Sequence, residues 1–294
     1  MMKATLAYFD AHCDTLSRCL RTGESLLNAS GQCNLLRLSR YEPSGQVFAI
    51  FLDSAKTPDI WENVQRQAAL FRREKERYPE YMRRAALSIE GGELLECNPE
   101  RLSDASAWGV RSVNLTWNHA NALSGSHAED PQRGLSDLGR AFVRRAAELG
   151  IYIDVSHLSD KGFFDLAEMN VMPLFASHSD SRAVGPHTRN LTDDQFRAIR
   201  DSGGVVGINL YREFVGGDGS MEALLRHFDH FLELDGETCL ALGSDWDGGI
   251  TGAGNLRGVE DMGRLADAMR GRGYGDSLIY NIFYGNLSRF LGMA

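Results

Sequence analysis

The chain is poor in cysteine, and its cysteines are not spaced for pairing. Five occur among 294 residues, and no two of them are separated by only two residues. An odd number without a CxxC pair argues against a disulfide framework. It also argues against a zinc site built from thiolates.

Long apolar runs and an excess of positive charge are also missing. No stretch approaches the roughly 18 apolar residues of a membrane span, and the first ten residues contain no apolar signal-peptide core. Acidic residues (40) outnumber Lys and Arg (31), which gives a net charge of −9. Nucleic acids and anionic membranes call for a basic face, so neither is expected as a partner. We expect a cytoplasmic protein.

The composition that remains is that of an ordinary folded chain. Hydrophobic residues make up 43% and charged residues 24%, which excludes disordered, collagen-like and coiled-coil sequences. At roughly 150 residues per domain the length suggests two domains. A single α/β barrel of about 250 residues or more is equally compatible.

Apolar, β-rich runs alternate with amphipathic helices along the chain. Apolar residues repeat every three or four positions over 60–71 and over 138–149, which predicts two helices with one buried stripe each. Gly150 then fits a left-handed helix end, and a further helix over Met221–Leu234 carries His227 and His230 as surface or packing residues. The eight runs are Leu6–Asp10, Val47–Leu52, Ala85–Ile89, Ser112–Leu115, Ile151–Val155, Pro173–Ala176, Val205–Leu210 and Cys239–Leu242.

Eight strands this apolar are buried on both faces, as in a parallel sheet. We therefore predict a single (β/α)8 barrel, of the TIM type, as one domain over residues 1–294. An open, doubly wound sheet is the alternative. In a barrel, the carboxyl ends of all strands open on one face, where active sites are built.

Polar residues follow the ends of five of these runs. In a barrel, three carboxylates and three imidazoles would converge on the same face. They are His12 and Asp14 after the first run, Glu90 after the third, His157 after the fifth, His178 after the sixth and Asp245 after the eighth.

Such a cluster favours a dinuclear metal site. Two carboxylates about 4 Å apart repel by roughly 4 kcal/mol at an effective dielectric constant near 20, so they need protons or cations. Histidine and carboxylate without thiolate suit zinc, and also manganese, iron or cobalt. Glu90 can bridge two ions, which can share a hydroxide that attacks a carbonyl or phosphoryl centre. Asp245 is a ligand, a general base or a loop cap, and Asp247 competes with it for this role.

Other polar features receive simpler interpretations. His119, His127 and His187 lie in loops on the presumed active face, where solvent-exposed or supporting roles are expected. The glycines over 216–219 have no phosphate-binding lysine nearby and predict a turn. A run of charged residues predicts a solvated helix face; it comprises Arg72, Arg73, Lys75, Glu76 and Arg77.

Taken together, these motifs resemble the renal (membrane) dipeptidase family of zinc peptidases, within the amidohydrolase-like metal barrels. The resemblance runs from about Asp10 to Asn286. Its carriers are Asp10–Thr15, Ile89–Gly91, Gly109–Arg111, Ile153–His157, Ala176–Ser179, Arg189–Asp194 and Gly243–Gly248.

The resemblance implies a role for each matching residue. His12, Asp14 and Glu90 would hold one zinc ion, and Glu90, His157 and His178 the other. Asp245 would act as the acid/base that moves a proton from the bridging hydroxide to the leaving amine. Arg189 would bind the free carboxylate of a dipeptide, since the guanidinium fork suits carboxylates. L-L and L-D dipeptides are the implied substrates, and a homodimer the implied assembly.

One departure from the family concerns the segment after the fourth strand. Animal members carry a histidine there that helps to polarise the scissile carbonyl, whereas Trp117 occupies the position here. Either His119 reaches in from a shifted loop, or Asn118 or Asn121 donates the hydrogen bond, or the contact is missing. Tyr211 is a further candidate for substrate binding.

Two other functions remain open at this point. The same ligands would serve another metal-barrel hydrolase that acts on N-acyl amino acids, cyclic amides or phosphoesters. A barrel kept as a non-enzymatic binding module is disfavoured, because unpaired buried carboxylates and histidines are costly to retain.

Overall fold

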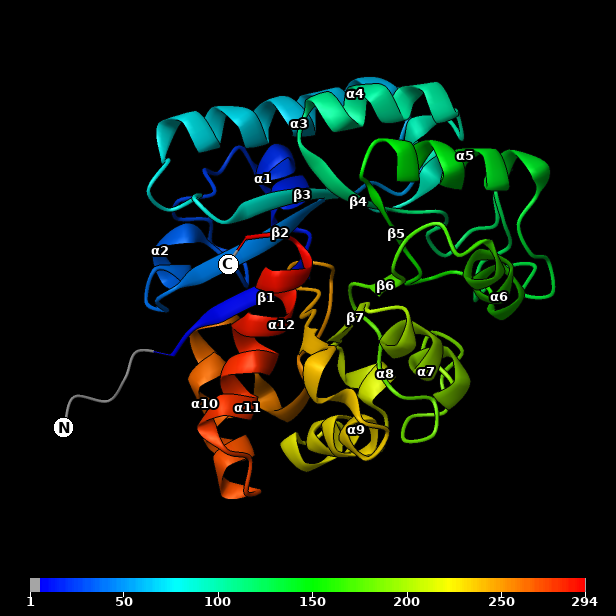
Figure 1. Cartoon of the computed structure of the whole chain (residues 1–294). Helices are drawn as coiled ribbons and strands as arrows, with labels where there is room; N and C mark the ends of the chain where they lie inside the picture. Colours follow the sequence, from blue (N-terminus) through cyan, green and yellow to red (C-terminus); the bar gives the residue numbers. More distant parts are fainter. Residues whose placement is uncertain (1–5, 294) are drawn as a thin grey trace.

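In the computed structural model, which describes residues 6–293, eight parallel strands form a closed barrel with helices around it (Figure 1). Each strand pairs with its neighbour in sequence order, and β8 pairs with β1 to close the barrel. The predicted (β/α)8 architecture is therefore confirmed. The strands are β1 (Tyr8–Cys13), β2 (Ser44–Ile50), β3 (Ala85–Ile89), β4 (Val110–Asn114), β5 (Tyr152–Asp154), β6 (Phe175–Ala176), β7 (Val205–Ile208) and β8 (Leu240–Leu242).

The helices lie outside the strands, and several short 3₁₀ turns connect them. None of the helices within residues 6–293 is both long and apolar enough to cross a lipid bilayer. They are α1 (Thr15–Thr22), α2 (Leu35–Leu38), α3 (Ile60–Arg77), α4 (Leu102–Ala107), α5 (Asp137–Glu148), α6 (Asp160–Met169), α7 (Asp193–Asp201), α8 (Arg212–Val215), α9 (Met221–Glu233), α10 (Met262–Gly271), α11 (Asp276–Tyr280) and α12 (Asn286–Phe290).

The helices form where the apolar periodicity predicts them, but Leu138, the first residue of the stripe predicted for α5, is 40% exposed and not buried. In α3 the apolar stripe is buried, and the charged residues 72, 73 and 75–77 are exposed, as expected. In α5 the side chain of Ser136 accepts a hydrogen bond from the amide of Gly139, which caps the amino end of the helix. Gly150 follows with φ +68°, the left-handed conformation that glycine adopts without strain.

The first strand extends further than the sequence indicates. It was expected to end at Asp10, but β1 continues to Cys13 and so contains His12. Asp10 is fully buried. Its carboxylate accepts hydrogen bonds from the Tyr8 hydroxyl and from the amides of His12 and Ser244, at 2.9–3.0 Å. A charged residue therefore lies inside the strand because its oxygens are satisfied, which an apolar pattern cannot show.

Two layers of apolar side chains fill the molecule. The larger lies between the strands and the outer helices. The smaller fills the barrel from its amino-terminal end, where Phe9 and Phe175 pack with Leu287 of α12. Helix α12 contacts β1, β7 and β8, so it closes this end of the barrel. The polar cluster lies at the opposite end of the barrel, where the strands have their carboxyl ends.

Candidate active site

The six predicted site residues meet at the carboxyl ends of the strands. Their potential ligand atoms form three overlapping groups, each with all atoms within 4.8 Å of one another. Five strands (β1, β3, β5, β6 and β8) and the segments that follow them supply these residues, as the barrel topology predicts. The groups are His12, Asp14 and Glu90; Glu90, His157 and His178; and His12, His178 and Asp245.

Glu90 lies at the centre of the cluster, and its two oxygens face different histidines. Oε2 is 3.6 Å from Nε2 of His12, whereas Oε1 is 2.9 Å from Nε2 of His157 and 3.5 Å from Nε2 of His178. The Nε2 atoms of His157 and His178 are 3.1 Å apart. On the other side, Oδ2 of Asp14 is 4.0 Å from Nε2 of His12. A carboxylate between two such sets has the arrangement of a bridging ligand.

The electrostatics of the cluster suit a bound cation. Burial disfavours charge on His12, yet Glu90, Asp14 and Asp245 outweigh this and raise the pKa of His12 to about 10. Burial and Glu90 raise the pKa of Asp14 well above its usual range. Both ring nitrogens of His12 and Oδ1 of Asp14 are buried without a hydrogen-bond partner within residues 6–293. Buried donors and acceptors of this kind need partners, and nitrogen and oxygen ligands fit a divalent metal.

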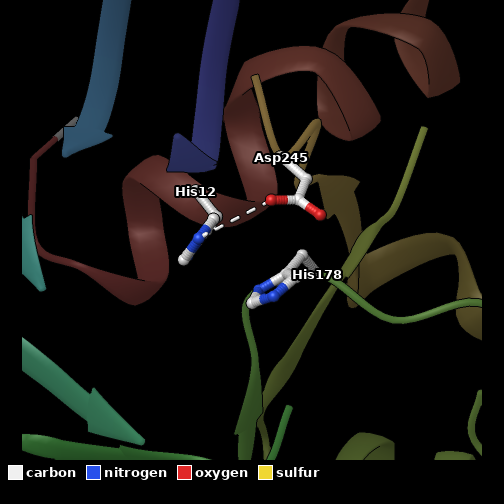
Figure 2. A group of neighbouring side chains, drawn as sticks. All are labelled: His12, His178 and Asp245. Atoms are coloured by element: carbon white, nitrogen blue, oxygen red, sulfur yellow. Dashed lines mark ion pairs between the residues drawn. The ribbon is translucent and has the colours of Figure 1, made fainter. Parts of the chain in front are cut away.

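Asp245 lies beside this cluster (Figure 2). Its Oδ1 is 3.9 Å from Nε2 of His12, and its Oδ2 accepts a hydrogen bond from Asn209 Nδ2 at 3.3 Å. Burial, reinforced by the charge of Glu90, raises the pKa of Asp245 to about 6. The residue has φ +62°, and a left-handed non-glycine residue costs of order 1–3 kcal/mol. The chain therefore holds this carboxylate in a strained conformation with a pKa near neutrality.

Asp247, the competing carboxylate, has a structural environment instead. It accepts hydrogen bonds from the Thr15 hydroxyl and from the amide of Gln32, both at 2.7 Å. Its oxygens thus join the loop after β8 to the loops that follow β1. This leaves Asp245 as the better placed of the two for chemistry.

The buried carboxylate of Asp154 holds the two segments that carry His157 and His178. Oδ1 of Asp154 accepts hydrogen bonds at 3.0 Å from the amides of Ser156 and Ser177, which immediately precede His157 and His178. The strands also approach closely here, because a Cβ on Gly243 would lie 1.8 Å from the Ser177 carbonyl oxygen. Only glycine allows this approach, so the backbone itself fixes the position of His178.

Asn118 orients one of the imidazoles. Its Oδ1 is 2.9 Å from Nδ1 of His157 and 3.0 Å from Nε2 of His127. An amide oxygen only accepts hydrogen bonds, so both rings must donate to it. His157 then carries its proton on Nδ1 and presents the lone pair of Nε2 to Glu90 and His178. Such a contact fixes a metal-ligating histidine in its tautomer and orientation.

We expect Asn118→Ala to lower metal affinity about 10- to 100-fold, the usual effect of removing a partner of a ligating histidine. Asn118→Asp keeps an acceptor and should retain most of the affinity. Competition with a chromogenic chelator measures both. Thr188→Ala is the matched control, since Thr188 bonds His127 at 3.1 Å but does not touch His157. Equal affinity in the Ala variant and the wild type would contradict the orienting role.

Arg189 is buried beside the cluster with donors to spare. Its side chain is 3% exposed, and Nη1 donates to the Ser179 hydroxyl at 2.9 Å. Nε and Nη2 are buried and have no partner within residues 6–293. Burial lowers the pKa of Arg189, while the charges of Asp245 and other acidic groups favour its charged form. A guanidinium with two unpaired nitrogens suits a carboxylate ligand.

The remaining predicted residues lie around the mouth of the site. His119 is half exposed, with Nδ1 3.3 Å from the Glu129 carboxylate. Tyr211 precedes α8, and its ring meets that of Phe214 edge-on at 4.9 Å. Partial burial and Glu213 raise the pKa of Tyr211 to about 12.

Trp117 forms an aromatic wall next to the cluster of histidines and carboxylates. Its ring centroid is 5.1 Å from that of Phe51 and 6.4 Å from that of His157. The residue at the position of the family's histidine therefore borders the cluster with an apolar surface.

In contrast, His227 and His230 are outside the site. His227 is buried and bonds the backbone of Ser181 and Val215, as a packing residue does.

Sequence reasoning missed two residues that support the site. Asn209 follows β7 and bonds Asp245; it lies within the seventh apolar run, Val205–Leu210, where a polar residue was the available signal. Ser177 has its hydroxyl 2.6 Å from Nδ1 of His178, and its only sequence signal is adjacency to that histidine.

The family of the chain follows from comparison with known proteins. The family model described as membrane dipeptidase (peptidase family M19) matches residues 1–294. The chain belongs to this family. An uncharacterized protein from the pqqA 5′ region of Klebsiella pneumoniae is 38% identical over 215 residues, which cover 69% of this chain and 79% of that protein. The dipeptidase aclJ of Aspergillus oryzae is 26% identical over 294 residues, covering 89% and 70%.

A solved structure agrees with this assignment. A metallo peptidase from Rhodobacter sphaeroides, liganded with a phosphinate mimic of the dipeptide L-Ala-D-Ala, superposes with a TM-score of 0.87. The two chains are 26% identical, and the match covers 98% of this chain and 99% of that one. As a member of the membrane dipeptidase family, the chain is a metallo-dipeptidase.

Proposed function

We propose that this chain, as a single domain over residues 1–294, hydrolyses dipeptides that have a free carboxylate, with two zinc ions as its cofactor. His12, Asp14 and Glu90 would hold one ion, and Glu90, His157 and His178 the other. The observation that carries the proposal is the placement of Glu90, whose two oxygens face different histidines in a buried site. When bound, the metal pair supplies a water that ionises near neutral pH and polarises the scissile carbonyl.

Asp245 is proposed as the group that moves the proton. Its carboxylate takes a proton from the attacking water and delivers it to the amide nitrogen as the peptide bond breaks. Its burial and its pKa of about 6 support this role, because a general base works best with a pKa near the working pH. The hydrogen bond from Asn209 holds the carboxylate in place.

Arg189 is proposed to bind the carboxylate at the end of the dipeptide. Its unpaired Nε and Nη2 are the donors that such a group requires. The resulting preference for a free carboxyl end would limit substrates to short peptides. The Rhodobacter peptidase was solved with a mimic of L-Ala-D-Ala, so we extend the proposal to both L-L and L-D dipeptides.

We propose that Asn118 also takes over the contact to the scissile carbonyl. Its Oδ1 is fixed by His157 and His127, and its Nδ2 has no hydrogen-bond partner within residues 6–293. An amide nitrogen held in this way is a suitable donor to a developing negative charge. His119 and Tyr211, at the mouth, would contact the outer parts of the substrate.

A substrate panel tests the proposed function. Zinc-loaded protein is incubated with L-L and L-D dipeptides, with matched tripeptides and with carboxy-amidated dipeptides, and free amino acids are scored by chromatography. We expect cleavage of free dipeptides only. Phenanthroline-treated protein without metal, and the same protein after zinc is returned, provide the control.

The outcomes separate the proposal from its rivals. Equal cleavage of amidated and free dipeptides would contradict the carboxylate clamp while leaving the metal chemistry intact. If a protein with two metals per chain cleaves none of the peptides, the substrate class is wrong. N-acyl amino acids, cyclic amides and phosphoesters are then the next compounds to assay.

A further inference from the structure

A cavity lies far from the proposed active site. It has a volume of about 570 Å³ and is bordered by α3, the end of α4, the start of β3 and Arg111 of β4. Ala85 and Ala86 in its wall are the first residues of β3, whereas Glu90 follows the other end of this strand. The cavity therefore opens at the amino-terminal end of the barrel, which is opposite to the end that bears catalytic residues. Figure 1 shows α3 and α4 on the same side of the barrel as β3 and β4.

Small residues create the space. Six of the thirteen residues that line the cavity are alanine or glycine. A Cβ placed on Gly109 would meet no atom within 4 Å. Trp108 adds an aromatic wall, and its ring lies 5.4 Å from that of Trp61. The small residues are Ala68, Ala69, Ala85, Ala86, Ala107 and Gly109.

The charged groups around the cavity all have the same sign. Arg72, Lys75 and Arg111 line it, and no Asp or Glu does. Within residues 6–293 none of the three forms an ion pair. Lys75 Nζ is 3.5 Å from the Ala85 carbonyl oxygen and 5.8 Å from the Phe71 ring, so its ammonium lies over the cavity wall. Arg111 donates from Nη2 to the Leu291 carbonyl oxygen at 2.9 Å, but its Nε is buried without a partner.

We propose that this cavity binds a small organic anion with an apolar body and one carboxylate or phosphate head. The volume is in the range of small-molecule sites, which combine an apolar lining with a few polar groups. Three cations with no acidic partner attract an anion and repel one another without it. Residues predicted only to form a solvated helix face, Arg72 and Lys75, would bind the head group. The proposal does not depend on the proposed dipeptidase reaction.

The test uses octanoate, octyl phosphate and octylamine, which share an apolar chain and differ in the head group. Isothermal titration calorimetry of the whole, metal-loaded chain should give saturable binding of at least one anion and none of the amine. Arg72→Glu combined with Lys75→Glu should weaken binding at least tenfold. Ala107→Phe, at an exposed wall position, should abolish it by filling the space. Comparing octanoate with octyl phosphate identifies the preferred head group.

Matched controls locate the binding. Arg66→Glu makes the same charge change at an exposed position of α3 that does not line the cavity, and it should leave binding unchanged. An anion could also enter the active site, so the titration is repeated in Arg189→Met, which should bind octanoate as the wild type does. All cavity variants should hydrolyse dipeptides at the wild-type rate.

Three results would overturn the proposal. One is the absence of saturable binding of either anion. Another is equal binding of octylamine, which would show a merely apolar cavity. The third is an equal loss of binding in the Arg66 control and the double variant, which would show a general effect of net charge.

Discussion

Replacing Asp245 by asparagine is expected to lower kcat about 10²- to 10⁴-fold, the usual contribution of a general acid–base group. Asparagine keeps the shape of the side chain and its contact with Asn209, but it cannot accept the proton of the attacking water. The five other residues of the cluster are unchanged, so metal content should stay at the wild-type level. A loss of turnover without a loss of metal would identify Asp245 as a group that moves protons.

The measurement compares kcat for one dipeptide with the metal content of the same sample by plasma emission spectroscopy. Asp247→Asn is the matched control, because the same change is made two residues away. Its carboxylate bonds Thr15 and the amide of Gln32, so this variant should lose about 1–3 kcal/mol of stability and keep its turnover. If Asp245→Asn hydrolyses the dipeptide near the wild-type rate, the assigned role is wrong.

The convergence of the site residues could be predicted from the sequence for a topological reason. Parallel strands of a barrel end on one face, so polar residues after the runs that end near His12, Glu90 and His178 must meet. No side-chain detail is required. The assignment of the runs themselves rested on their apolar character, which is strong because such strands are buried on both faces.

The contacts that orient these residues could not be predicted in the same way. Asn118 and His157 are 39 positions apart, and their hydrogen bond depends on the paths of two loops without regular periodicity. The extension of β1 past Asp10 depends on donors from Gln46 of β2 and from Ser244, which follows β8. The cavity beside Arg111 is lined by residues of α3, α4, β3 and β4, and a run of alanines does not by itself indicate a void.

Replacing Arg189 by methionine is expected to raise KM for free dipeptides roughly 30- to 4,000-fold, with a smaller change in kcat. Truncating one partner of a buried, hydrogen-bonded charge pair costs about 2–5 kcal/mol, and each 1.4 kcal/mol is a factor of ten in affinity. Arg189 is buried, and two of its nitrogens have no partner. No other group near this side chain would take over their contact with the substrate carboxylate. Arg189→Lys, which keeps the charge but loses the fork, should give an intermediate KM.

Amidated dipeptides distinguish a substrate clamp from a structural arginine. The wild type should strongly prefer the free carboxylate, and this preference should vanish in Arg189→Met because the discriminating charge is gone. A structural defect would instead affect both substrates equally. Arg197→Met is the matched control, since Arg197 lies eight residues further along the chain in α7, bonds the Asp194 carboxylate and should leave KM unchanged. An unchanged KM in Arg189→Met, with the thermal midpoint preserved, would remove the clamp from the mechanism and require another source for the proposed preference for dipeptides.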